Sequence, residues 1–125
     1  MKILVSDPIT EAGLAILKAA DLDVVYLPEA DPEEKRDAAE NVHGWIVRSG
    51  TKVSAEAINS AKHLTVIGRA GVGIDNIDLN AATRKGVVVM NTPDVNTISA
   101  AEHTIAMMLP LSRNIHMGHG GLEKG

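Results

Sequence analysis

Five short runs of apolar residues divide the chain, and a segment with helical spacing follows each of them. The predicted strands are Lys2–Ser6, Asp23–Leu27, Trp45–Val47, Thr65–Gly68 and Val87–Asn91. Their apolar residues are continuous rather than alternating, which is typical of parallel strands covered by helices on both faces. The alternation of strands and helices therefore predicts an α/β fold.

Each predicted helix has its own start or stop signal. The helices are expected from Pro8 to about Ala20, from Asp31 as N-cap, from Ser54 to about Ala61, from Asp78 to a stop at Gly86, and from about Thr97 to Arg113. Pro32 at the first helical position suits the second helix, because its missing N–H has no partner there anyway. Pro110 lies inside the last helix and is expected to kink or end it.

The order βαβαβαβαβα predicts a doubly wound parallel sheet with right-handed crossovers. Five units of this kind fit the flavodoxin-like strand order 2-1-3-4-5. We expect a single flavodoxin-like, substrate-binding domain over residues 1–125. In it, residues 1–96 hold the sheet and the first four helices, 97–117 form the last, crossover helix, and 118–125 form a flexible tail rich in glycine.

Composition narrows the classes of function. The net charge is −4, with 12 basic and 16 acidic residues and no basic block, so nucleic acid is not an expected partner. The absence of cysteine excludes disulfides, a thiol nucleophile and a cysteine-ligated metal. No apolar run approaches the roughly 20 residues that span a membrane, and the start is too short for a signal peptide. We therefore expect a cytoplasmic protein without a membrane partner.

Polar and cationic residues follow the predicted strands, at the edge where open α/β sheets bind ligands. They are Asp7, Arg48-Ser49-Gly50-Thr51, Arg69-Ala70-Gly71-Val72-Gly73, and Asn91-Thr92-Pro93 leading to Asn96. Arginine grips carboxylates and phosphates in a bidentate manner, and glycine turns expose backbone N–H groups to an oxyanion. This edge is therefore predicted to bind a small anion, although an arginine after a strand is often only a solvated surface residue.

The stretch Gly71-Val72-Gly73-Ile74-Asp75-Asn76 also resembles a dinucleotide fingerprint. That motif needs a third glycine, where Asn76 stands, and an acidic residue about 20 positions later, after a second strand. The next strand here ends in Met90-Asn91 and the helix between is short. We therefore predict no complete cofactor site in this stretch.

The histidines do not form a recognisable site in the sequence. His43, His63, His103, His116 and His119 are scattered. The pair His116-x-x-His119 has a spacing that suits a metal, but no carboxylate is near it, and surface histidines are the simpler interpretation. We predict no metal site and no catalytic residue in this chain.

Several motifs in register resemble the NAD-dependent D-2-hydroxyacid dehydrogenases, and within them the D-3-phosphoglycerate branch, which serves serine biosynthesis. The motifs are Arg48-Ser49-Gly50-Thr51-Lys52-Val53, Gly68-Arg69-Ala70-Gly71-Val72-Gly73-Ile74-Asp75-Asn76-Ile77-Asp78, Ala81-Ala82-Thr83-Arg84-Lys85-Gly86, Val89-Met90-Asn91-Thr92-Pro93 and Asn96-Thr97-Ile98-Ser99-Ala100-Ala101-Glu102. The resemblance covers essentially the whole chain. The resemblance implies an oxidoreductase family in which a flavodoxin-like substrate domain faces a Rossmann cofactor domain.

The resemblance also implies roles for particular residues. Arg48, Ser49 and Asn96 would line the substrate side, and the turn from Arg69 through Gly71, Val72 and Gly73 would offer backbone amides to the substrate carboxylate. Val72 would approach the nicotinamide in an intact enzyme. The family's catalytic arginine, glutamate and histidine and its Rossmann fingerprint come from a later part of the family's chain than these 125 residues match. We therefore expect a substrate-binding segment that binds no NAD and is inactive by itself.

Two other classes remain open at this point. One is an engineered or reconstructed flavodoxin-like module that folds alone and has no activity, in which case the last helix should fold back on its own sheet. The other is a receiver or flavin-binding protein of the same fold, which the arginine at position 48 and the near absence of aromatic residues disfavour. Expected partners are a small anionic substrate, bound weakly, and a second copy through dimer formation or helix exchange.

Overall fold

The computed structural model describes residues 1–94, 96–115 and 117–118 of the chain. It consists of two compact units, Met1–Pro93 and Asp94–Gly125, and each is described by itself. The predictions for His116 and His119 lie outside the described residues, as does the predicted tail apart from Gly118.

A five-stranded sheet forms the centre of the first unit. Its strands are β1 (Lys2–Val5), β2 (Asp23–Tyr26), β3 (Gly44–Val47), β4 (Val66–Arg69) and β5 (Val88–Asn91). All pairings are parallel, and the order is β2-β1-β3-β4-β5. The predicted α/β class and the flavodoxin-like order 2-1-3-4-5 are therefore confirmed, with strand ends that differ from the predicted ones by one residue or less.

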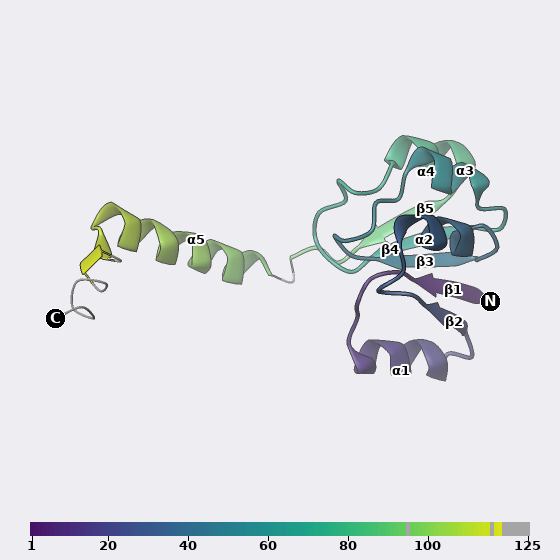
Figure 1. Ribbon diagram of the computed structural model, residues 1–125, viewed down its shortest axis with the longest axis horizontal. Helices are drawn as coiled ribbons and strands as arrows, with labels where there is room; N and C mark the ends of the chain where they lie inside the picture. Colours follow the sequence, from purple (N-terminus) through teal and green to yellow (C-terminus); the bar gives the residue numbers. More distant parts are fainter. Residues whose placement is uncertain (95, 116, 119–125) are drawn as a thin grey trace. The chain divides into compact units, whose positions relative to one another are not determined.

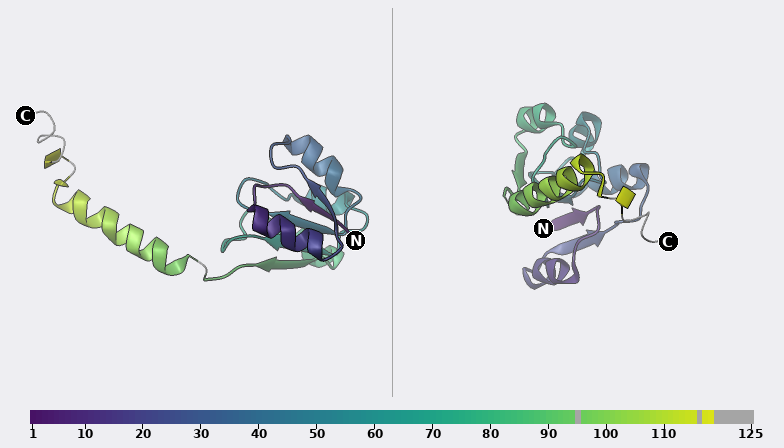
Figure 2. Two further views of the ribbon diagram at one scale, coloured as in Figure 1. Left: turned by 90° about the horizontal axis from the view of Figure 1, so that it is seen from below. Right: turned by 90° about the vertical axis from the view of Figure 1, so that its left-hand side faces the viewer.

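Four helices flank this sheet and a fifth lies in the second unit. They are α1 (Glu11–Ala19), α2 (Pro32–Ala39), α3 (Ala55–Ser60), α4 (Leu79–Lys85) and α5 (Thr97–Ser112). Figures 1 and 2 show α1 on one face of the sheet and α2, α3 and α4 on the other. Helix α5 continues past Pro110 and ends at Ser112, so this proline stands in the last turn. None of the helices in the described part of the chain has the length and apolar character needed to cross a membrane.

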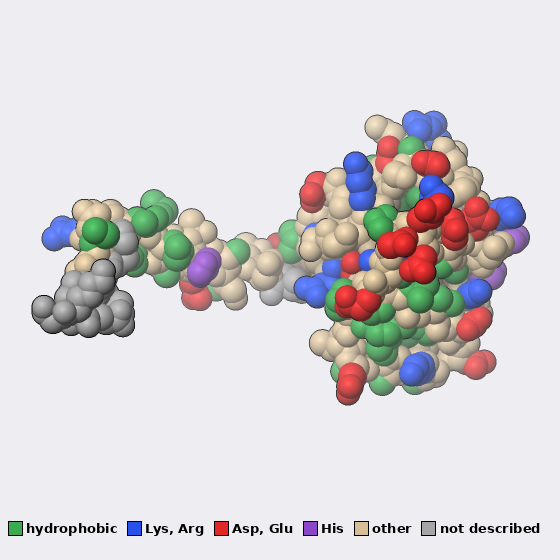
Figure 3. Space-filling model, viewed as in Figure 1, with side chains coloured by type: hydrophobic (Ala, Val, Ile, Leu, Met, Phe, Trp, Pro, Cys, Tyr) green, Lys and Arg blue, Asp and Glu red, His purple; other side chains and the backbone are tan. Residues whose placement is uncertain are grey.

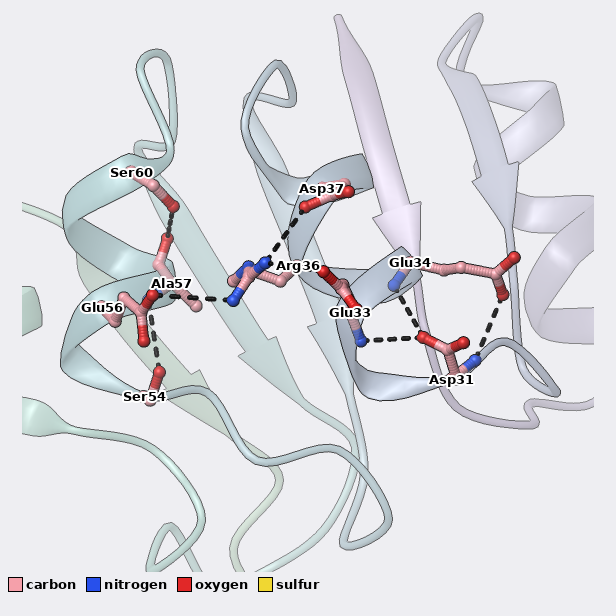
Figure 4. A network of polar contacts seen from close by, with 9 residues as sticks. All are labelled: Asp31, Glu33, Glu34, Arg36, Asp37, Ser54, Glu56, Ala57 and Ser60. Atoms are coloured by element: carbon pink, nitrogen blue, oxygen red, sulfur yellow. Dashed lines mark hydrogen bonds and ion pairs between the residues drawn. The ribbon is translucent and has the colours of Figure 1, made fainter.

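The predicted N-caps hold the starts of the helices (Figure 4). Asp31 Oδ1 accepts hydrogen bonds from the backbone N–H groups of Glu33 and Glu34 at 2.9 Å, and the Glu34 side chain accepts from Asp31 N–H. This capping box satisfies donors that the first turn leaves free. Acidic side chains gather where α2 lies on the face shown in Figure 3, and Arg36 of α2 meets Glu56 of α3 at 3.6 Å. Such exposed ion pairs contribute little to stability.

The hydrophobic core lies between the sheet and the three helices α2, α3 and α4. Trp45 is its largest buried side chain, with 1% of its surface exposed. Other members of this core include Leu4, Val47, Val53, Ile58, Ile67, Ala81 and Ala82. The opposite face is less covered at β5, where Val88 and Met90 are each 57% exposed.

Lys85, at the end of α4, caps the C-terminal end of α3. Its ammonium group donates hydrogen bonds to the carbonyl oxygens of Ile58, Asn59 and Ala61, with a distance of 3.0 Å to the Asn59 oxygen. These carbonyls belong to the last turn of a helix of six residues, where no intrahelical donor remains for them. A side chain of α4 therefore completes α3.

Gly86 ends α4 in the left-handed conformation, with φ of 73°, and a Cβ added there would meet no atom within 4 Å. Gly86→Ala is expected to lower the free energy of unfolding by about 1 kcal/mol, because the strain is confined to the backbone. Urea unfolding followed by circular dichroism measures the effect. Gly13→Ala in α1 is the matched control, since its added Cβ has contacts of 3.5 Å or more and no positive φ. Equal stability of Gly86→Ala and the unaltered chain would contradict this prediction.

Candidate anion-binding edge of the sheet

The loops that follow β3, β4 and β5 lie side by side at the carboxyl edge of the sheet. Val47 pairs with Arg69 and Arg69 pairs with Asn91 across the three strands. Ala70 N–H donates to Val47 O at 2.8 Å, so the pairing continues one residue past β4. The segments that the sequence predicted to meet are therefore adjacent in the structure.

Asp7 forms hydrogen bonds with the loop of residues 48–51, and its side chain is buried, with only 3% of the residue exposed. Asp7 Oδ2 accepts hydrogen bonds from the N–H groups of Arg48 at 2.5 Å and Thr51 at 3.1 Å. Asp7 Oδ1 accepts from the Thr51 hydroxyl at 2.9 Å. A Cβ on Gly50 would lie 2.7 Å from the same Oδ1, so the close approach requires glycine. The buried carboxylate thus has several donors, all from one loop.

A buried polar chain connects this loop to the core. Trp45 Nε1–H donates to Ser6 Oγ at 2.8 Å, and Ser6 Oγ–H donates to Thr51 Oγ1 at 3.0 Å. Ser6 is fully buried and Thr51 is 5% exposed, so each hydroxyl needs a partner within the protein. The loop is therefore coupled to the largest side chain of the core.

Asn76 joins the loop of residues 48–51 to the turn that follows β4. Its side-chain amide donates to the carbonyl oxygens of Arg48 and Thr51, at 2.6 Å each. Its backbone carbonyl oxygen accepts from Val53 N–H at 2.8 Å, beside an isolated parallel bridge between Val53 and Ile77. The sequence interpretation treated Asn76 only as a missing glycine. No local pattern marks this role, because both side-chain partners lie at least 25 positions away.

Three carbonyl oxygens of the turn of residues 69–73 accept hydrogen bonds within the protein. Gly71 N–H donates to Arg69 O at 2.9 Å, Thr92 N–H donates to Gly71 O at 3.1 Å, and the Asn91 amide donates to Val72 O at 2.7 Å. In the part of the chain that the structure describes, the N–H groups of Val72 and Gly73 have no hydrogen-bond partner. These two neighbouring N–H donors suit an anion.

Two arginines add positive charge to this edge. Arg48 is exposed, and its Nη1 donates to Pro8 O at 3.1 Å. The Arg69 side chain folds over Gly71, where an added Cβ would lie 1.8 Å from Nη1, and its buried Nε has no hydrogen-bond partner among the described residues. Among residues 1–94, 96–115 and 117–118, neither arginine forms an ion pair with a carboxylate. Their charges are therefore available to a ligand.

A groove of about 660 Å³ opens beside Arg48, between α1 and the sheet. Ile9, Ile16 and Ile46 supply much of its apolar lining, with Arg48 and Ala70 at its carboxyl-edge end. This combination suits a small molecule with an anionic end, since pockets are mostly apolar with a few fixed polar groups.

The predicted site residues are divided between the two units. Arg48, Ser49, Arg69 and the turn 71–73 share the edge of the sheet in the first unit. Asn96 belongs to the second unit, where it is exposed at the N-cap position of α5 without a capping hydrogen bond from its side chain. Its role beside the others stays a prediction. The described residues contain no group of three or more histidine or acidic side chains that would hold a metal.

The residues after β4 do not fit a dinucleotide pyrophosphate. In that motif the helix starts within the glycine turn and the third glycine allows close packing. Here α4 starts only at Leu79, and Asn76 uses its side chain to hold the neighbouring loop. We therefore assign no cofactor chemistry to these residues.

The fold and this edge define a flavodoxin-like α/β domain with a cationic, donor-rich turn region. A family model for the D-isomer specific 2-hydroxyacid dehydrogenase catalytic domain matches residues 3–118. The chain belongs to this family, as its motifs predicted.

Curated relatives agree with this assignment. The D-3-phosphoglycerate dehydrogenase of Archaeoglobus fulgidus is 46% identical over 125 residues, which are 100% of this chain and 24% of the relative. The enzyme of the same name from Rattus norvegicus is 47% identical over 124 residues, which are 99% of this chain and 23% of the relative. The chain thus spans about a quarter of the length of the curated relatives it matches.

A solved structure is also similar. The NAD⁺-bound 3-phosphoglycerate dehydrogenase of Entamoeba histolytica shares 36% identity with a TM-score of 0.75, covering 88% of this chain and 38% of that chain. The likeness extends over most of the fold described above.

Proposed function

We propose that this chain is the substrate-binding part of an NAD-dependent dehydrogenase of the D-3-phosphoglycerate type. Arg48, Ser49, Arg69 and the turn 71–73 hold the anionic substrate, and Asn96, which lies in the second unit, stays a further predicted contact. The main support is the turn of residues 69–73, where the N–H groups of Val72 and Gly73 have no hydrogen-bond partner, and neither Arg48 nor Arg69 has an ion pair, among the described residues.

The substrate class follows from the charges at this edge. A 3-phosphoglycerate molecule carries a carboxylate and a phosphate, and each group is a bidentate partner for a guanidinium group. The residues of this chain bind and orient such a substrate. In the proposed whole protein NAD would accept the hydride, and Val72 is the residue of this chain that we propose would approach it. We propose that the 125-residue chain binds substrate but catalyses no oxidation by itself.

Titration of the ¹⁵N-labelled chain with 3-phosphoglycerate tests this function. The amide signals of Ser49, Gly50, Val72 and Gly73 are expected to shift, with a dissociation constant in the millimolar range (~−4 kcal/mol), because an open edge leaves the ligand solvated. Glycerol 3-phosphate lacks the carboxylate and should shift Val72 and Gly73 less. The absence of shifts at this edge would overturn the proposed site, and NAD-dependent turnover by the chain alone would overturn its inactivity.

Arg69→Met is expected to weaken 3-phosphoglycerate binding about tenfold or more, because a charge-assisted hydrogen bond contributes roughly 1.5–3 kcal/mol. Arg84→Met is the matched control, since Arg84 is exposed on α4 and forms no ion pair among the described residues. It should change the affinity less than about twofold, as expected for an exposed, distant charge. Equal weakening by both substitutions would show a general charge effect instead of a site.

A further inference from the structure

Two side chains outside the proposed contact set, those of Asp7 and Asn76, form hydrogen bonds with the loop of residues 48–51. We propose that Asp7 and Asn76 are positioning residues for the anion site: together they fix this loop so that its tip presents N–H groups to the ligand. The inference deepens the proposed function and rests on it for the identity of the ligand. Neither residue needs to touch that ligand.

The backbone N–H and carbonyl groups of Arg48 and Thr51, the two end residues of the loop, all form hydrogen bonds. The N–H groups of Arg48 and Thr51 donate to the Asp7 carboxylate. The carbonyl oxygens of the same two residues accept from the Asn76 amide. Within the described residues, the N–H groups of Ser49 and Gly50 have no hydrogen-bond partner. We call Asp7 and Asn76 the clamp of this loop. The clamp leaves the N–H groups of Ser49 and Gly50, at the tip of the loop, free for a ligand.

Burial makes this loop conformation strongly preferred. Asp7 is 3% exposed, so a loop that moved away would leave a carboxylate without its donors in a poorly solvated place. The donors to Asp7 are backbone groups and the Thr51 hydroxyl, while the Arg48 guanidinium donates to Pro8 O instead. Asp7 thus orders the loop without pairing with the Arg48 charge.

The hydrogen bonds that Asn76 donates to the loop require a side-chain amide group. Its nitrogen has two protons, and each is directed to a different carbonyl oxygen of the same loop. An aspartate at this position would place an acceptor against two acceptors. The substitution Asn76→Asp therefore reverses the interaction with almost no change of size.

The test uses Asp7→Asn and Asn76→Asp in the 125-residue chain. Asp23→Asn and Asn41→Asp are the matched controls, because both residues are exposed and their side chains have no hydrogen bond or ion pair among the described residues. Chemical-shift titration with 3-phosphoglycerate measures binding, and amide hydrogen exchange measures loop order. Both readouts are compared with strand residues such as Leu4 and Ile67, which report whether the sheet remains folded.

We expect both clamp variants to lower the initial slope of shift against ligand concentration about tenfold, since the ligand must then order the loop itself. Exchange at Arg48 and Thr51 should also accelerate about tenfold while the sheet is unchanged, and the controls should resemble the unaltered chain. Folded clamp variants with unaltered binding or unaltered exchange at these amides would overturn the inference.

Two further outcomes separate this inference from the proposed function. If the unaltered chain does not bind 3-phosphoglycerate, the proposed function fails, and the exchange rates at Arg48 and Thr51 alone decide whether the clamp orders the loop. If Asp7→Asn does not fold, Thr51→Val replaces it, because this variant removes the hydroxyl donor to Asp7, together with the acceptor of the Ser6 hydroxyl, and keeps the Thr51 N–H. Unchanged exchange and binding in that variant and in Asn76→Asp would count against the clamp.

Discussion

Trp45→Ala is expected to lower the free energy of unfolding by about 3–5 kcal/mol, the range for truncating a large buried aromatic side chain. Trp45 is 1% exposed and packs in the core beneath α2 and α3. The substitution also removes the Nε1–H that donates to Ser6. Since a small domain has a total stability of only about 5–15 kcal/mol, much of it would be lost.

Urea unfolding followed by far-ultraviolet circular dichroism measures this effect, because the variant has no tryptophan left to report fluorescence. Val88→Ala is the control on an exposed strand position and should cost about 0.5–1 kcal/mol. Trp45→Phe separates packing from hydrogen bonding, since it keeps an aromatic ring but removes the donor. A loss below about 1.5 kcal/mol for Trp45→Ala would show that the core adapts around the missing ring.

Gly71→Ala is expected to weaken 3-phosphoglycerate binding about 10- to 150-fold while leaving the stability almost unchanged. An added Cβ would lie 1.8 Å from Arg69 Nη1, so the guanidinium group must leave its place over the turn. That movement removes a charge-assisted hydrogen bond worth roughly 1.5–3 kcal/mol. The backbone itself is not strained, because Gly71 does not adopt a positive φ and the displaced group is the end of a flexible side chain.

Gly68→Ala is the matched control for this effect on affinity. It adds the same methyl group one residue before Arg69, at an ordinary distance of 3.8 Å from Ile46. The double variant Arg69→Met with Gly71→Ala should bind no more weakly than Arg69→Met alone, since both changes remove the same interaction. Additive losses would mean that Gly71 acts through the backbone of the turn instead of through Arg69.

The topology was predictable because each element has a signal of its own. Continuous apolar runs indicate parallel strands, and Asp31, Ser54 and Asp78 each accept the hydrogen bond expected of an N-cap. Gly86 ends α4 at the predicted residue. The right-handed crossover rule then leaves few arrangements for five units. Local chemistry and chain order were therefore sufficient for the fold.

The candidate site was predictable only in part. Arg48, Arg69 and the glycine turn follow strands, so the carboxyl-edge rule places them together. The roles of Asp7 and Asn76 depend on hydrogen bonds between residues that lie 25 to 44 positions apart in the sequence. No local sequence pattern indicates such contacts. The place of Asn96 in the site, the position of the last helix and the exchange of that helix with a second copy stay predictions.

The hydrogen bonds of Lys85 couple the local opening of α3 to that of α4. A helix of six residues does not persist in water on its own, and the last carbonyls of α3 depend on an ammonium group from α4. When α4 opens, α3 loses these donors at the same moment. The two helices should therefore open and close as one cooperative segment. A substitution that destabilises one of them should destabilise the other equally.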